Sequence, residues 1–247
     1  MPCDARPIIL TASIIMLVSR AAAFTWPSFL PAPSSTTMPI QQKQQSTQEK
    51  VTFLTSLNQK NAFNTATKQR TELLNAMVAS NPTTRPGSID SFESIAPGTW
   101  QIVYAPHIST LSGLLGGSFD PVLYKLNSDG TIVSHAKYSF PIIGQGWLSV
   151  SGTYGSEDDC DICRVDFDRA WIEVGQQDGS SGELQPIGSF DDSPDDWYKG
   201  VVNSLGQIGF RQEFAVFPVS YLDNDTIVFD FELFGTRICA RKVKNTA

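Results

Sequence analysis

The amino-acid sequence predicts a mainly β protein, an antiparallel up-and-down barrel of about eight strands that follows an N-terminal helical preface. Three observations support this prediction. Apolar residues recur at helical intervals within residues 48–80, apolar and polar residues alternate in most segments of residues 99–243, and turn sequences such as "NSDG" and "LDND" separate those segments. A closed barrel leaves no exposed sheet edge, which favours it, but a flattened β-sandwich fits the same pattern.

The N-terminal residues have the composition of targeting segments. Residues 1–23 contain Arg6, an apolar run too short to span a bilayer and a final "AAA", which predicts a secretory signal peptide. Residues 24–45 contain prolines, serines and threonines but no acidic residue, as a disordered plastid transit peptide does. The order of the two, with "AAAF" at the junction, resembles the bipartite targeting sequences of algae with secondary plastids and implies a plastid (chloroplast) location. The alternative is a secreted protein with a Pro/Ser-rich linker.

Residues 46–247 are expected to form one domain that begins with two helices. Ser46 and Glu49 have the spacing of a capping box, so the first helix is expected to start there. The second helix is expected to end at Asn81 and Pro82. Its apolar face comprises Leu73, Leu74, Met77 and Val78.

The strands follow from the alternating segments. They are expected at residues 99–105, 120–127, 131–140, 146–155, 162–174, 209–217, 225–233 and 235–243. The Gly-, Ser-, Asp- and Pro-rich residues 175–196 are expected to be mobile. After them, "DDWYKGVVNSLGQI" predicts a short helix across one mouth of the barrel.

The charge of the chain excludes some partners. Its formal net charge is −7, and no basic stripe with interleaved aromatic residues is found, so we expect no nucleic-acid partner. Anionic lipid headgroups would be repelled as well, but neutral lipids would not. Beyond the signal peptide no apolar run approaches the length of a transmembrane helix, so a soluble or peripheral protein is expected.

The sequence gives little support to metal, redox or catalytic chemistry. Cys160 and Cys163 form one C-x-x-C, which lacks the partners of a four-ligand zinc site. Cys3 belongs to the expected signal peptide, so Cys239 leaves an odd number of cysteines in the mature chain. A disulfide and inert thiols remain alternatives. His107 is expected in a loop and His135 on the solvent-facing side of a strand, in phase with Val133 and Lys137 and opposite more apolar neighbours. We therefore expect no catalytic residue, no metal and no cofactor.

The sequence "PGTWQIVYAP" places a glycine two residues before a tryptophan at the start of the first strand. Gly98 permits a close turn, and Trp100 is then able to close one end of the barrel, as the G-x-W of lipocalins does. In that comparison a late arginine, Arg237 or Arg241, stacks on Trp100 in a cation–π contact. The alternative is a tryptophan that anchors an ordinary β core.

Apolar residues that share strand faces are candidates for a lipid-binding interior. They are Trp100, Ile102, Tyr104, Leu148, Val150, Tyr154, Val165, Phe167, Ile227, Phe229 and Phe231. The same residues fit a completely filled core equally well. Residues 107–117 are a candidate access loop, because the uncharged "HISTLSGLLGG" places apolar residues at helical spacing between glycines. These are Ile108, Leu111, Leu114 and Leu115, and a core-packing plug is the alternative.

Two quoted segments together resemble the plastid lipid-associated proteins, also called plastoglobule fibrillins. They are "GTWQIVYA" in the first strand and "VSYLDNDTIVFDF" near the C-terminus, and the resemblance runs from Glu49 to Val243. It implies a lipocalin-like barrel at plastoglobules, thylakoids or in stroma that binds a fatty acid, carotenoid or quinone. Where plant members have an arginine after the Y-L-D segment, this chain has Thr226 followed by "FDFELFG", so the final strands differ.

The function expected from this resemblance is non-enzymatic: a plastid lipid-binding protein that holds or carries one small apolar lipid. Two other classes remain as alternatives. One is a structural coat of plastid lipid globules, and the other is an enzyme that acts on an isoprenoid or oxylipin. Peripheral contact with a thylakoid or plastoglobule surface is expected for the lipid-binding and coat functions.

Overall fold

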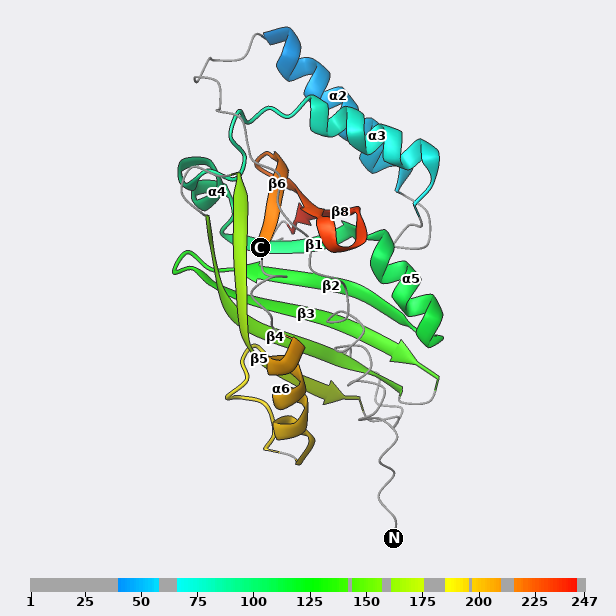
Figure 1. The fold of residues 1–247 in the computed structure, drawn as a ribbon, viewed down its shortest axis with the longest axis vertical. Helices are drawn as coiled ribbons and strands as arrows, with labels where there is room; N and C mark the ends of the chain where they lie inside the picture. Colours follow the sequence, from blue (N-terminus) through cyan, green and yellow to red (C-terminus); the bar gives the residue numbers. More distant parts are fainter. Residues whose placement is uncertain are drawn as a thin grey trace.

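Eight antiparallel strands close into a barrel in which each strand pairs with its neighbours in sequence (Figure 1). This computed structural model describes residues 40–57, 66–141, 144–156, 161–175, 185–195, 197–209 and 216–243. It confirms the predicted mainly β barrel and excludes the sandwich. The strands are β1 (Gly98–Tyr104), β2 (Ser118–Leu126), β3 (Thr131–Phe140), β4 (Gly144–Ser156), β5 (Ile162–Val174), β6 (Val216–Leu222), β7 (Thr226–Phe231) and β8 (Thr236–Lys242).

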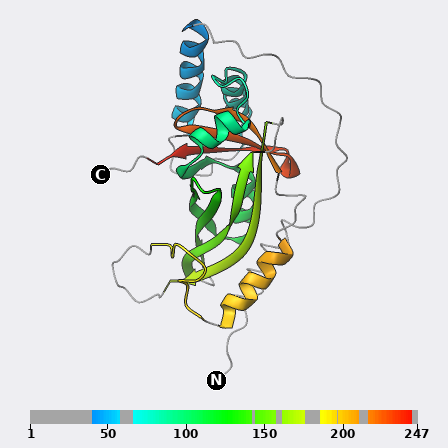
Figure 2. The ribbon, with the colours of Figure 1, turned by 90° about the vertical axis from the view of Figure 1, so that its left-hand side faces the viewer.

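The two halves of the barrel differ in length. β3, β4 and β5 have 10, 13 and 13 residues, whereas β6, β7 and β8 have 7, 6 and 7. The longer strands therefore project beyond the shorter ones, as Figures 1 and 2 show. We call the end of the barrel where β3 ends and β4 begins the mouth, and the projecting strands form one side of this end.

The position of β6 differs from the prediction, which placed this strand at residues 209–217. The observed strand runs from Val216 to Leu222 and contains Pro218. Proline has no N–H to donate and is normally excluded from central strands, so the sequence pattern favoured a strand that ended before it. Pro218 lies at the end of the three-residue β5–β6 ladder, opposite Ile162, and outside the β6–β7 ladder, which begins at Val219. The ladder with β7 therefore requires no N–H from the proline.

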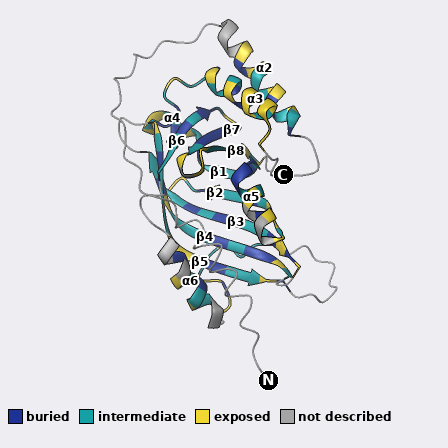
Figure 3. Ribbon diagram, turned by 45° about the vertical axis from the view of Figure 1, so that its right-hand side comes forward, coloured by how far each residue is buried: buried dark blue, intermediate teal, exposed yellow. Residues whose placement is uncertain are grey.

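Two helices, α2 (Ile40–Ser56) and α3 (Lys68–Ala79), pack together against the outside of the barrel. They are mostly exposed or half-buried, whereas the buried residues concentrate in the strands (Figure 3). The predicted start of the first helix is wrong, since Ser46 lies inside α2 and is buried. The six residues from Ile40, mostly glutamine and lysine, are good helix formers that extend the helix toward the N-terminus.

The apolar face predicted for α3 is confirmed, and it forms one side of a second hydrophobic cluster. Leu74 and Met77 are buried, with Leu73 and Val78 partly buried beside them. The cluster lies between the helices and the outer face of the barrel. It also contains Phe53, Leu57, Tyr104, Tyr221, Val228 and Cys239.

Three shorter helices complete the fold. α4 (Ile89–Ile95) leads into β1, and α5 (Pro106–Leu115) follows β1 and lies beside β2 and β8. α6 (Trp197–Gly209) packs along β5 and not across a mouth as predicted. Its Asn203 Oδ1 accepts a hydrogen bond from the backbone N–H of Ala170 at 3.1 Å, so α6 covers part of β5 beyond the short β5–β6 ladder. None of the described helices combines the length and apolar character needed to cross a membrane.

Candidate functional site

Trp100 closes the end of the barrel opposite the mouth, where α4 enters β1. Its indole N–H donates to the carbonyl of Ala96 at 2.7 Å, and the side chain is 1% exposed. The cation over the ring is Lys242, whose Nζ lies 5.1 Å from the ring centroid and donates to the carbonyl of Ile95 at 2.7 Å. The closed end therefore has the tryptophan–cation pair, but the cation is a lysine.

The expectation for Arg237 and Arg241 is wrong because both lie on the outer face of β8. Side chains alternate along a strand, and Trp100 pairs with Lys242, which places Lys242 on the inner face and Arg241 on the outer one. Arg237 instead forms an ion pair with Asp230 at 2.6 Å. The role of Gly98 is direct, since its φ of +141° is unusual for other residues and a Cβ there would lie 2.5 Å from Lys242 Cε.

Most of the predicted interior residues do face inward. The main core contains Trp100, Ile102, Tyr154, Ile227 and Phe229, with Leu148, Val165, Phe167 and Phe231 packed against it. Val150 shares their face, since it pairs with the inward-facing Ser134. Tyr104 does not, because the β1–β8 register shifts between Ile102 and Tyr104 and turns the tyrosine outward, where it packs edge-on against Phe53 at 5.6 Å.

A cavity lies within the barrel. Its volume is about 50 Å³, counted as the space open to the centres of water molecules. One water molecule needs about 10–15 Å³ on the same measure. The barrel is therefore not completely filled. The cavity is lined by Phe92, Tyr124, Leu126, Ile132, Cys163, Val165, Phe167, Phe217, Phe229 and Ile238.

Seven of these ten lining residues were absent from the predicted set. Phe92 lies on α4, a helix that the sequence analysis did not predict, and contacts Phe229 edge-on at 6.3 Å. Tyr124 and Leu126 could have been found, since they are in phase with Val122 along β2 and flank the polar Lys125. Ile238 is likewise in phase with Ala240 on β8. Cys163 faces the cavity, so its buried thiol belongs to the lining.

The only polar groups of the lining residues' side chains are a phenol and a thiol. Burial raises the pKa of Tyr124 to about 12, and burial also raises the pKa of Cys163. Both side chains are therefore neutral at physiological pH. Tyr124 nevertheless keeps part of its surface accessible, as expected for a side chain that borders an internal space.

The mouth is bounded by aromatic residues and by α5. Phe231 stacks on Phe217 with ring centroids 5.7 Å apart, and the ring of His107 lies 4.8 Å from that of Phe231. His107 is buried at the start of α5 and not in a loop, and desolvation lowers its pKa to about 4. Ile108 packs against the core.

The predicted access segment is helical rather than a loop. The side chains that the access hypothesis needs, Leu111, Leu114 and Leu115, lie outside the residues whose side chains are described. The choice between access element and plug thus remains a prediction. Gly116 ends α5 in the left-handed conformation with φ +68°.

His135 is buried and does not face solvent as predicted. It lies on the outer face of β3, where its Nδ1 is 2.8 Å from Ser149 Oγ and its ring contacts Trp147 and Trp171 edge-on. Phe190 packs against Trp171, so part of the segment expected to be mobile covers this surface. Desolvation, followed by the charge of Lys125, lowers the pKa of His135 to about 4.

This arrangement brings a serine and a histidine together, as in nucleophilic catalysis. Ser149, however, is 0% exposed. A substrate therefore has no route to its hydroxyl in this structure, and the pair is a buried polar contact beneath the outer layer. We assign no catalytic role to it.

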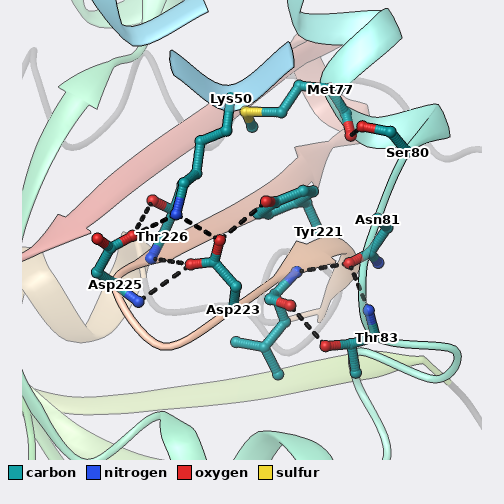
Figure 4. Close-up of polar contacts among 10 residues, drawn as sticks. Lys50, Met77, Ser80, Asn81, Thr83, Tyr221, Asp223, Asp225 and Thr226 are labelled. Atoms are coloured by element: carbon teal, nitrogen blue, oxygen red, sulfur yellow. Dashed lines mark hydrogen bonds and ion pairs between the residues drawn. The ribbon is translucent and has the colours of Figure 1, made fainter. Parts of the chain in front are cut away.

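A polar network joins α2 to the turn between β6 and β7 (Figure 4). Lys50 Nζ lies 2.6 Å from Asp223 Oδ2 and 2.9 Å from Asp225 Oδ1. Asp223 Oδ1 also accepts hydrogen bonds from the backbone N–H groups of Asp225 and Thr226, and the Tyr221 hydroxyl donates to Asp223 Oδ2. We call this set of five residues the Lys50 clamp.

The sequence analysis left open whether the cysteines form a disulfide or are inert thiols, and the structure describes two of them. Cys163 and Cys239 are free and buried, the first toward the cavity and the second in the outer cluster. Cys160, the other cysteine of the C-x-x-C, lies outside the described residues. Among the side chains that the structure describes, no three His, Cys, Asp or Glu residues gather as metal ligands would.

Comparison of the chain with protein-family models and with curated proteins gives no match.

Proposed function

We propose that the protein binds one small lipid inside its barrel. The observation that supports this most is the internal cavity, which is apolar and lies within a closed eight-stranded barrel. The interior of an eight-stranded barrel is either filled by side chains or holds one small ligand. A further support is the partial exposure of inward-facing residues such as Leu148, Val150 and Val165, since a filled core would leave such residues with little accessible surface.

The resemblance of "GTWQIVYA" and "VSYLDNDTIVFDF" to plastid lipid-associated proteins supports the same function. The second segment supplies four of the five residues of the Lys50 clamp, so its polar side chains bear on how α2 attaches to the barrel. The first segment supplies Gly98 and Trp100, which form the closed end. In this proposal both segments stabilise the barrel, and the cavity binds the ligand without an enzymatic step.

Filling the cavity tests this proposal. Val165→Phe adds a ring to the lining, whereas Val133→Phe makes the same change on the outward side of β3. Titration of the protein with a solvatochromic fatty dye should give saturable binding, weakened at least about tenfold by Val165→Phe and unchanged by Val133→Phe. Mass spectrometry of lipids that copurify with the wild-type protein would identify the natural ligand class. Dye binding that is equal in all three proteins would place the dye on the surface and refute a cavity site.

We also propose that the protein is delivered to a plastid by residues 1–48. The composition and the "AAAF" junction support this. Fusion of residues 1–48 to a fluorescent protein should give plastid fluorescence that Phe24→Ala redirects to the secretory pathway. Secretion of both fusions would contradict the proposal.

A further inference from the structure

The Tyr124 hydroxyl is the polar group most suited to contact a ligand in the cavity. Tyr124 lines the cavity from β2, on the same face as its cross-strand partners Trp100 and Ser134. Within the part of the chain that the structure describes, its hydroxyl has no hydrogen-bond partner. Tyr124 borders an apolar cavity, so a bound molecule with an accepting oxygen would supply the hydrogen bond that the barrel does not.

Other inward-facing tyrosines show how unusual this is. The Tyr154 hydroxyl donates to the backbone carbonyl of Asn127 at 2.8 Å, and the Tyr138 hydroxyl donates to that of Glu173 at 3.1 Å. These two hydroxyl groups are satisfied by the barrel itself. The Tyr124 hydroxyl, in contrast to these two, is available to hydrogen-bond with a ligand.

The charges around the cavity limit the ligand further. None of the ten lining residues carries a cationic side chain. Lys242 is the cation in register with Trp100, but its Nζ lies over the indole and donates to the carbonyl of Ile95. An ionised carboxylate at Tyr124 would therefore lose its hydration without gaining a cation, which is strongly unfavourable.

We propose that the cavity selects a neutral lipid that carries a hydrogen-bond-accepting oxygen, such as a ketone, quinone or ester carbonyl, and that Tyr124 donates to this oxygen. The inference rests on the proposed lipid-binding function and narrows it, because it excludes an ionised fatty acid. The oxygen-bearing group enters first and reaches Tyr124, and the apolar tail extends past Phe217 and Phe231 toward the mouth. The tail direction follows from the aromatic residues there and the closed end at Trp100.

Three probes with the same ring and decyl chain separate the contributions: methyl 4-decylbenzoate, 4-decylbenzoate and decylbenzene. Each would displace a solvatochromic dye at pH 7.5 from wild type, Tyr124→Phe and Tyr138→Phe. Tyr138→Phe is the matched control, since Tyr138 does not line the cavity and its hydroxyl already has a protein partner. Circular dichroism and the unfolding midpoint would check that the variants are folded.

The expected pattern has two parts. Tyr124→Phe should weaken the methyl ester about tenfold, the effect of one lost hydrogen bond, while the affinity for decylbenzene is unaffected. Tyr138→Phe should change the affinity for neither probe. In wild type the carboxylate should bind at least about tenfold more weakly than its methyl ester.

The outcomes that overturn the inference differ from those that overturn the proposed function. If the ester loses no affinity in Tyr124→Phe, Tyr124 is not the anchor and water serves it instead. If the carboxylate binds as tightly as the ester, the neutral-lipid selection is wrong. In both cases lipid binding itself would stand. If none of the three probes displaces the dye from any of the proteins, the proposed lipid-binding function fails.

Discussion

At the scale of single residues, the closed end of the barrel depends on the side of β8 that each cation occupies. Lys242 lies inside, where its ammonium contacts the face of Trp100 and the carbonyl of Ile95. Desolvation lowers the pKa of this lysine, so the contacts must offset part of the cost of burying the charge. Arg241, one residue earlier, is exposed on the outer face.

Replacement of Lys242 by methionine should therefore destabilise the protein by about 1–2 kcal/mol, through loss of the cation–π contact and of one hydrogen bond. Arg241→Met, the same change at the adjacent outward position, should change the free energy of unfolding by less than about 0.5 kcal/mol. Urea unfolding followed by tryptophan fluorescence measures both. Equal effects of the two substitutions would show that the inward position of Lys242 has no special energetic role.

The sequence contained the information needed for Lys242 but not for Tyr104. Lys242 is in phase with the apolar Ile238 and Ala240, and phase alone would have placed it inside. The comparison with lipocalins drew attention to arginine as a residue type and away from this alternation. Tyr104 also fits the alternation of β1, but a register shift reverses its side, and nothing in the local pattern marks that shift.

At the scale of secondary-structure elements, the Lys50 clamp connects α2 to the barrel across a long stretch of sequence. Burial raises the pKa of the Asp225 carboxyl, but hydrogen bonds from Lys50 and Thr226 outweigh burial and lower that pKa to about 2. Burial lowers the pKa of Lys50, and its bonds to Asp223 and Asp225 outweigh this and raise it. Lys50 and Asp225 are therefore both charged at neutral pH.

Lys50→Met should cost about 1–3 kcal/mol, because it leaves two carboxylates close together without their cation. The loss should be largest at neutral pH and should shrink as the pH falls below about 4, where the variant's carboxylates become protonated. Lys68→Met is the control, since the side chain of Lys68 on α3 is 92% exposed and its ion pair with Glu72 is long, at 4.0 Å. Guanidinium unfolding of the three proteins at pH 7 and pH 3.5 measures the effect. A penalty equal to that of Lys68→Met would contradict the clamp.

The predictability of each element depends on whether its pattern is local. β3 and β5 have the predicted bounds, since long, regular alternation determines them. α4 was missed because seven residues are too few for a clear helical period, and α5 was read as a loop because its glycines weaken the signal. The packing of α6 along β5 depends on the short β5–β6 ladder, which no segment reveals by itself.

At the scale of the whole molecule, the cavity is a property of the closed barrel and could not be predicted from composition. The same apolar strand faces fit a filled or a hollow interior, and only the lengths and closure of all eight strands distinguish them. Both histidines of the chain are buried. His135 lies beneath the outer layer on β3, and His107 lies at the mouth. We therefore expect that burial to make the folded protein less stable at acidic pH.

The free energy of unfolding should decrease as the pH falls from about 6.5 to about 4. In this range the unfolded histidines, with an ordinary pKa of 6.5, bind protons that His107 and His135 in the folded protein do not, because desolvation lowers the pKa of each to about 4. The unfolded state then holds more protons, so stability rises with pH through this window, by up to about 3 kcal/mol for each histidine. Urea unfolding of wild type, His107→Gln and His135→Gln at pH 7.0, 5.5 and 4.5 should show a shallower pH dependence in each variant. A pH dependence as steep as that of wild type in His135→Gln, together with an NMR titration midpoint of His135 near 6.5, would show that this ring is accessible to water and that the outer layer does not cover it in solution.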